Sequence, residues 1–118
     1  MASEDHILYR APVQRVPAPA EVARRVAALR DALERFGYER AILFGSGARG
    51  DMHEGSDLDV LVVRRTDLPF VERPRALLEM LPSGLAVDVV VYTPEEFARL
   101  SADPRGVVAS ALAEGVEL

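Results

Sequence analysis

The chain has 118 residues, 28% of them charged, and a formal net charge of −5. It contains no Cys, which excludes disulfides, thiolate nucleophiles and Cys-ligated metals, and all 14 basic residues are Arg, which excludes Schiff-base lysines and a Walker-type phosphate lysine. The acidic balance argues against binding nucleic acid through backbone charge alone. No apolar run approaches the ~20 residues of a membrane span, and residues 1–10 lack the pattern of a signal peptide. We therefore expect a cytoplasmic protein.

The first half of the chain predicts an arm, a helix and a strand. Residues 1–20 are expected to form an N-terminal arm, with a short edge strand over 7–13 and prolines that prevent anything longer. Apolar positions three and four apart over 20–36 predict an amphipathic helix that ends at Gly37. A short apolar strand over 41–44 then meets a glycine-rich turn.

The second half predicts two more strands and three helices. A strand is expected over 57–63, a helix over 70–81 and a third strand over 86–92. A capping box from Thr93 to Glu96 then begins one helix, and a last helix runs from 103 to about 114. This order predicts an α/β (α+β) domain from residue 21 to the end, with a small mixed β-sheet of three to four strands covered by helices.

Three aspartates lie in predicted strands that are otherwise almost entirely apolar. Asp57 and Asp59 belong to the second strand and Asp88 to the third. Because residues i and i+2 of a strand face the same side, Asp57 and Asp59 are neighbours, about 6.6 Å apart at Cα at ~3.3 Å per residue. If the third strand lies beside the second, Asp88 completes a cluster of carboxylates. Such oxygen ligands select Mg²⁺ or Mn²⁺, and without a cation they repel one another.

Purely structural explanations of these aspartates stay open. Asp57 follows Ser56 and could cap the turn that precedes the strand. For Asp59 and Asp88 a structural explanation requires a buried Arg partner, since an unpaired buried charge is costly.

The glycine-rich turn over residues 45–50 (GSGARG) is a candidate phosphate site. Glycines permit positive φ and close backbone approach, and a helix that begins after them presents free N–H groups, so Gly45 and Ser46 are candidate phosphate ligands. The turn matches neither a Walker loop nor the dinucleotide fingerprint. Arg49 has two open roles: it could contact phosphate bidentately, or it could brace the loop by pairing with Asp51 or another acid.

A phosphate-binding turn and a metal-binding carboxylate pair at adjacent strand ends are the two parts that nucleotidyl transfer requires. At these residues the chain resembles the nucleotidyltransferase superfamily that includes DNA polymerase β, and within it the minimal nucleotidyltransferases (MNT) of prokaryotes. Their pattern of Gly-Ser-x-Ala-Arg-Gly, then Ser-Asp-x-Asp and an apolar strand, is matched at residues 45–50 and 56–63. Their third carboxylate is matched by Asp88. The resemblance covers about residues 22–118 and implies the polymerase β-like nucleotidyltransferase fold.

The resemblance also implies a role for each of these residues. Asp57 and Asp59 would bind two Mg²⁺ ions, with Mn²⁺ as a substitute. Asp88 would bind the catalytic ion and help accept the proton of the attacking hydroxyl. Gly45 and Ser46 would hold the triphosphate of ATP, whose AMP is transferred while pyrophosphate leaves.

The acceptor is the least constrained part of this prediction. We see no room after the third strand for an acceptor-binding domain, so a partner or a second copy of the chain is expected to supply that surface. The resemblance implies a small helical HEPN partner, a toxic ribonuclease that receives AMP on a tyrosine, and an antitoxin role for this chain. Two alternatives stay open: a nucleotidyltransferase for a small acceptor bound at a homodimer interface, and a non-catalytic antitoxin that covers its partner. Three buried carboxylates argue against the last, because a pure binder does not need them.

Overall fold

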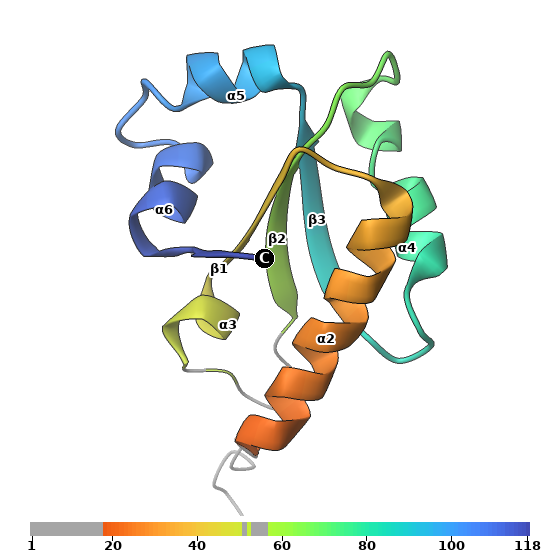
Figure 1. The fold of residues 1–118 in the computed structure, drawn as a ribbon. Coiled ribbons are helices and arrows are strands. Elements are labelled where there is room, and N and C mark those ends of the chain that lie inside the picture. Colours follow the sequence, from red (N-terminus) through yellow and green to blue (C-terminus); the bar gives the residue numbers. More distant parts are fainter. Residues whose placement is uncertain (1–17, 51, 53–56) are drawn as a thin grey trace, which may run out of the picture.

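The computed structural model describes residues 18–50, 52 and 57–118, which form a four-stranded sheet with helices on both faces (Figure 1). The strand order is β3-β2-β1-β4. Strand β1 (Arg40–Phe44) pairs antiparallel with both β2 (Leu58–Val63) and β4 (Val116–Glu117), whereas β2 and β3 (Val87–Tyr92) run parallel. The mixed sheet predicted from the sequence is confirmed, and β4 is a strand that the sequence did not predict.

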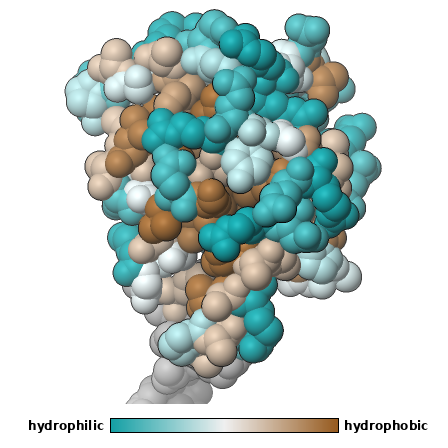
Figure 2. All heavy atoms as spheres, in the orientation of Figure 1, coloured by the Kyte–Doolittle hydropathy of each residue, from teal (hydrophilic) through white to brown (hydrophobic). Residues whose placement is uncertain are grey.

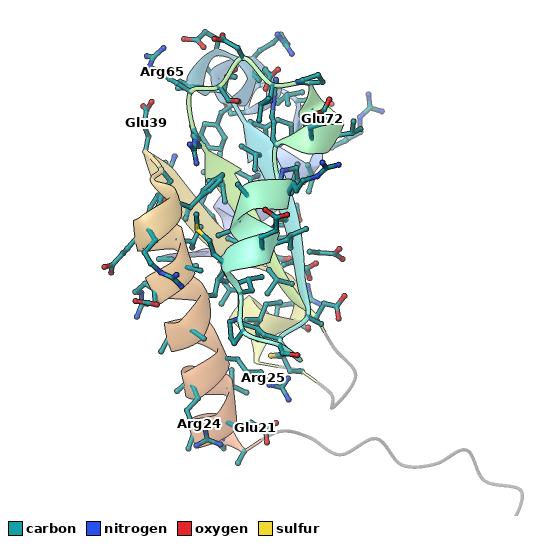
Figure 3. All side chains as sticks on the ribbon, turned by 90° about the vertical axis from the view of Figure 1, so that its right-hand side faces the viewer. Glu21, Arg24, Arg25, Glu39, Arg65 and Glu72 are labelled. Carbon is teal, nitrogen blue, oxygen red and sulfur yellow. The ribbon has the colours of Figure 1, made fainter. Side chains whose placement is uncertain are left out.

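One face of the sheet is covered by α2 (Pro19–Phe36) and α4 (Arg75–Met80), which lie in front of it in Figure 3. Helix α2 has Pro in its first turn, where no backbone N–H is needed, and ends at Gly37, whose φ of +87° favours glycine. Its apolar stripe packs on the alternate strand residues that point to this side. The buried residues of this layer are Leu29, Ala32, Leu33, Phe36, Ala41, Leu43, Met52, Leu58, Val60, Val62, Leu77 and Val91.

Of the described elements, α5 (Pro94–Leu100) and α6 (Val107–Glu114) lie on the other face. The smaller core beneath them consists of Ile42, Leu61, Val63, Val108 and Ala111. The one-turn helix α3 (Ser46–Arg49) lies at the lower end of the sheet, where β1 ends and β2 begins (Figure 1). On the side seen in Figure 2, hydrophilic residues spread over the top of the molecule, and apolar residues gather around α6 and the middle of the face.

Two predicted helices differ from their observed forms. The helix predicted over 70–81 is split into a 3-10 helix, η1 (Phe70–Glu72), and α4, because Pro74 lacks the N–H that a continuous helix would use. The last helix was predicted to begin at Asp103 but begins at Val107, since the Asp103 carboxylate accepts a hydrogen bond from the Arg105 N–H and forms a turn instead.

Other boundaries agree more closely. The capping box is confirmed: Thr93 Oγ1 accepts from the Glu96 N–H at 3.2 Å, and Glu96 Oε1 accepts from the Thr93 N–H at 2.9 Å. Strand β2 begins one residue later than predicted, so Asp57 precedes it. Most of the predicted arm, including its strand over 7–13, lies outside the described residues, and residues 19 and 20 belong to α2. Among the described residues, no helix is both long enough and apolar enough to span a membrane.

Candidate functional site

The register of three adjacent strands aligns the predicted site residues. Phe44 of β1 is paired with Asp59 of β2, and Asp59 is paired with Asp88 of β3. Directly paired residues of neighbouring strands point to the same face, so Asp59 and Asp88 lie side by side on the face of α5 and α6. Asp57 precedes Asp59 by two positions and belongs to the same side of the chain. The condition on which the sequence prediction depended, that the second and third strands are neighbours, is therefore met.

The three aspartates are less buried than the sequence suggested. Asp57 and Asp88 are exposed, and only Asp59 is half-buried. The expectation of three buried carboxylates is wrong, because β3 is an edge strand of the described sheet and Asp57 precedes β2. Burial raises the pKa of Asp59, the charges of Asp88 and Asp57 raise that pKa further, and the charge of Arg49 lowers it. Asp59 is therefore destabilised in its charged form by its surroundings.

The chemistry of this donor set fits a hard divalent cation. Within residues 18–50, 52 and 57–118, no three His, Cys, Asp or Glu side chains are close enough, as arranged, to hold one ion together. Asp59 and Asp88 nevertheless offer carboxylate oxygens on one face, and the like charges that raise the Asp59 pKa are those that a cation would offset. The cation whose charge lowers the Asp59 pKa is Arg49, and Arg49 is exposed, so it is not the buried Arg partner that a structural explanation of Asp59 requires.

Gly45 connects the glycine-rich turn directly to the aspartates. Its φ of +70° and ψ of −150° lie in a region that is essentially restricted to glycine. A Cβ at this position would overlap Asp59 Oδ2, so the Gly45 backbone lies against the Asp59 carboxylate. Both the backbone conformation and the close approach require glycine here.

Helix α3 begins directly after Gly45. The Gly45 carbonyl accepts hydrogen bonds from the N–H groups of Ala48 and Arg49, and Gly50 closes the turn with φ +81°. The first N–H groups of a helix have no partner within the helix, so those of Ser46 and Gly47 point out of its N-terminal end. Gly45 and Ser46 are therefore placed beside the aspartates, and their contact with phosphate stays a prediction.

Arg49 braces the loop. Its Nη1 donates a hydrogen bond to Oε1 of Glu114, and the two atoms are 3.1 Å apart. Glu114 is the last residue of α6. The bracing role left open by the sequence is therefore observed, with Glu114 as the acid, while Asp51 lies outside the described residues. Sequence reasoning missed Glu114, which is 65 residues from Arg49 along the chain and has no local signal.

A hollow of about 250 Å³ opens beside Asp88 on the α6 side of the sheet. Its walls are apolar and come from three elements: Phe44 of β1, Val89 and Val90 of β3, and Val107 of α6. Asp88 is the single charged residue in this lining. The exposed carboxylate thus has a space beside it that a small group or a side chain can enter.

Comparisons with known proteins agree with this geometry. The model of the nucleotidyltransferase domain family matches residues 26–116, which include all three aspartates and the glycine-rich turn. The chain belongs to the nucleotidyltransferase domain family. A relative from Methanocaldococcus jannaschii named "putative protein adenylyltransferase" is 39% identical over 59 residues, which are 50% of this chain and 58% of the relative. This chain therefore matches little more than half the length of that curated relative.

The fold of this nucleotidyltransferase domain is also found among solved structures. The crystal structure of a putative nucleotidyltransferase from Sulfolobus solfataricus superposes with a TM-score of 0.56 at 21% sequence identity. The superposition covers 81% of this chain and 80% of the other. The predicted nucleotidyltransferase fold is thereby confirmed.

Proposed function

We propose that this chain transfers AMP from ATP to a hydroxyl group of a protein, in a reaction that depends on Mg²⁺. The observation that carries the proposal is the pairing of Asp59 with Asp88 directly beside the Gly45 backbone. Membership of the nucleotidyltransferase domain family supports the type of reaction. The name of the archaeal relative supports a protein as the acceptor.

The residues of the chain have distinct roles in this proposal. Gly45 and Ser46 hold the triphosphate through backbone N–H groups and the Ser46 hydroxyl. The acceptor hydroxyl oxygen attacks the α-phosphorus and forms a new P–O bond, while the bond from that phosphorus to the bridging oxygen of pyrophosphate breaks. Pyrophosphate leaves with the electron pair. The hydroxyl proton passes to the carboxylate of Asp88, which is exposed and therefore accessible to the acceptor.

Asp57, Asp59 and Asp88 are the residues that would hold Mg²⁺, as two ions, with Mn²⁺ as a substitute. When bound, the metal supplies positive charge that offsets the charge on the triphosphate and on the attacking and leaving oxygens. Asp59 is the central ligand, because it lies between Asp88 and the Gly45 backbone.

Arg49 acts mainly as a brace in this proposal. Its guanidinium is held by Glu114, and its charge lowers the pKa of Asp59. Arg49 thereby keeps the glycine-rich turn beside the aspartates.

For the partner, we propose a small helical HEPN-type toxin that receives AMP on a tyrosine, with this chain as its cytoplasmic antitoxin. The apolar hollow beside Asp88 supports an acceptor that inserts a side chain. The net charge of −5 argues against a nucleic-acid acceptor. A homo-oligomer that binds a small acceptor is the alternative.

The test uses ATP labelled at the α-phosphate, with Mg²⁺ and the protein product of the adjacent gene. The wild type should label that protein, and Asp59→Asn should not, although it should fold. Label on a small hydroxyl compound and not on the protein would support the alternative acceptor. If the wild type binds no MgATP and transfers no label, the proposed activity is wrong and the chain acts by contact alone.

A further inference from the structure

Within residues 18–50, 52 and 57–118, strand β3 presents an open edge next to the candidate site. It is the terminal strand of the sheet that these residues form, and β2 is its one partner among them. The hydrogen bonds from the Leu58 N–H to the Ala86 carbonyl and from the Arg64 N–H to the Tyr92 carbonyl show which β3 residues turn their backbone toward β2. In a parallel ladder these alternate, so the backbone groups of Val87, Val89 and Val91 point outward.

One end of this edge already has a partner. Arg73 Nη1 donates to the Val91 carbonyl at 3.1 Å, and the same guanidinium is held by Glu96. The remaining outward positions are those of Val87 and Val89, next to Asp88. An edge with unpaired N–H and C=O groups is a template for an added strand, and proteins usually cover or charge such edges.

A groove of about 470 Å³ runs along the same edge, between β3 and α4. In Figure 3, β3 lies beside α4 at the edge of the sheet. Much of its wall is apolar, formed by Val71, Pro74, Leu78, Val87 and Val89. Val71 is 84% exposed and Leu78 is 44% exposed, which is unusual for residues of this type grouped at one site. An extended peptide matches both features, since its main chain pairs with the edge and alternate side chains enter the groove.

The groove and the hollow described above meet at Asp88, which lines both. Alternate residues of an added strand point to opposite faces, so a segment on this edge directs one set of side chains into the groove and the other toward the hollow beside Asp88. We propose that the protein acceptor binds as an extended segment paired with β3 at Val87 and Val89, with its hydroxyl residue directed to Asp88. This inference rests on the proposed function and specifies how that acceptor is recognised.

A second copy of the chain fits this edge less well than a segment of another protein. Two β3 strands paired antiparallel about Val89 would place the Asp88 residues of both copies within two positions of each other. Each copy also carries a net charge of −5, so the contact would bring like charges together. Such a dimer would also occupy the place of the acceptor.

The probe is a library of nonapeptides, randomised except for a central tyrosine, serine or threonine, incubated with α-labelled ATP and Mg²⁺. A second library carries N-methyl groups at alternate amides, which prevent strand pairing. The wild type should label the first library at least roughly tenfold more than the second. Leu78→Glu and Val71→Glu, in the groove wall, should each lower labelling of the first library roughly tenfold and leave MgATP binding unchanged.

The matched control is Leu112→Glu on α6. Leu112 lies outside the groove and is 42% exposed. This variant should label the first library as strongly as the wild type does. Equal labelling of the two libraries, or unchanged labelling by both groove variants, would overturn the inference. Label on a small hydroxyl compound but on neither library would also overturn it and leave nucleotidyl transfer intact. Absence of both transfer and MgATP binding would instead refute the proposed function.

Discussion

The two faces of strand β2 differ in chemistry although their residues alternate along one chain segment. Leu58, Val60 and Val62 point to the layer of α2 and α4, where each is at most 1% exposed. Asp59 lies between two of them and points to the opposite face, where it is half-buried next to Asp88. One face is closed along the whole strand, and the other is open at the end where the carboxylates lie.

This difference shows how a small domain can support a repelling cluster. Like charges on one face destabilise the fold, and the apolar layer on the other face offsets that cost, because the same strand contributes to both. The second face itself changes along β2, from the fully buried Leu61 beneath α6 to the half-buried Asp59 two residues earlier. The open end is therefore a local feature on a rigid support.

The largest expected effect comes from opening the closed face. Leu58→Ala should lower the free energy of unfolding by about 2–4 kcal/mol, because it removes a side chain that is 1% exposed and leaves a cavity. Urea denaturation followed by circular dichroism measures the change. The control Leu112→Ala, at an exposed leucine of α6, should cost less than about 1 kcal/mol. A similar small loss for Leu58→Ala would show that this face is not tightly packed.

The second effect separates backbone strain from site geometry. Gly45→Ala should cost about 1–3 kcal/mol through its positive φ and should also weaken MgATP binding, because the new Cβ overlaps the Asp59 carboxylate. Gly37→Ala has the same kind of backbone strain, with φ +87° and nothing within 4 Å of the new Cβ. It should lower stability and leave MgATP binding unchanged in titration calorimetry. Equal loss of binding in both variants would contradict the contact between Gly45 and Asp59.

The third effect concerns the ion pair between Arg73 and Glu96, which joins the two helical layers. Arg73, which follows η1, donates to Glu96 of α5 at 2.6 Å. Hydrogen bonds from Arg73 and from the Thr93 backbone lower the pKa of Glu96 from 4.5 to about 2. A lowered pKa means that the carboxylate stabilises the fold above pH 4.5 and that this contribution is lost as the pH falls toward 2.

Glu96→Gln should therefore cost about 1–2 kcal/mol at pH 7, from the weakened capping box and the lost charge pair. The difference from the wild type should shrink as the pH is lowered from 4.5 to 2, as measured by thermal unfolding. The control is Glu95→Gln, whose pair with Arg65 is 71% exposed on both sides and should contribute less than about 0.5 kcal/mol. A difference that persists unchanged at pH 2 would show that the Glu96 charge is not the cause.

Sequence patterns were sufficient for features that depend on neighbours along the chain. Alternation within the strand placed Asp57 and Asp59 on one side, and the Thr93–Glu96 capping box was recognised from residue types three positions apart. Whether Asp88 lies next to Asp59 depended on the order of the strands in the sheet, which local sequence patterns do not give. The parallel pairing of β2 with β3 in the structure places the two residues side by side.

Features that depend on distant segments were missed. Strand β4 has only two residues and exists because it pairs with β1, far along the chain. The contact of Glu114 with Arg49 likewise depends on how α6 packs. The degree of burial of the aspartates was overestimated for the same reason: an apolar strand sequence does not reveal that β3 is an edge strand or that β2 begins after Asp57.

The smallest expected effect is a gain in stability, and it tests the electrostatics of the open end. Burial and the charges of Asp88 and Asp57 raise the pKa of Asp59 above its ordinary value of 3.8, so its charged form destabilises the fold at neutral pH. In metal-free buffer at pH 7, Asp59→Asn should raise the melting temperature slightly. As the pH falls toward 3.8 the wild-type carboxylate takes up a proton and the advantage should disappear. Conversely, MgATP should stabilise the wild type much more than Asp59→Asn. A variant that melts clearly below the wild type in metal-free buffer would mean that Asp59 has a stabilising partner. The face of β2 that carries the aspartates would then stabilise the fold, and charge repulsion would not distinguish it from the apolar face.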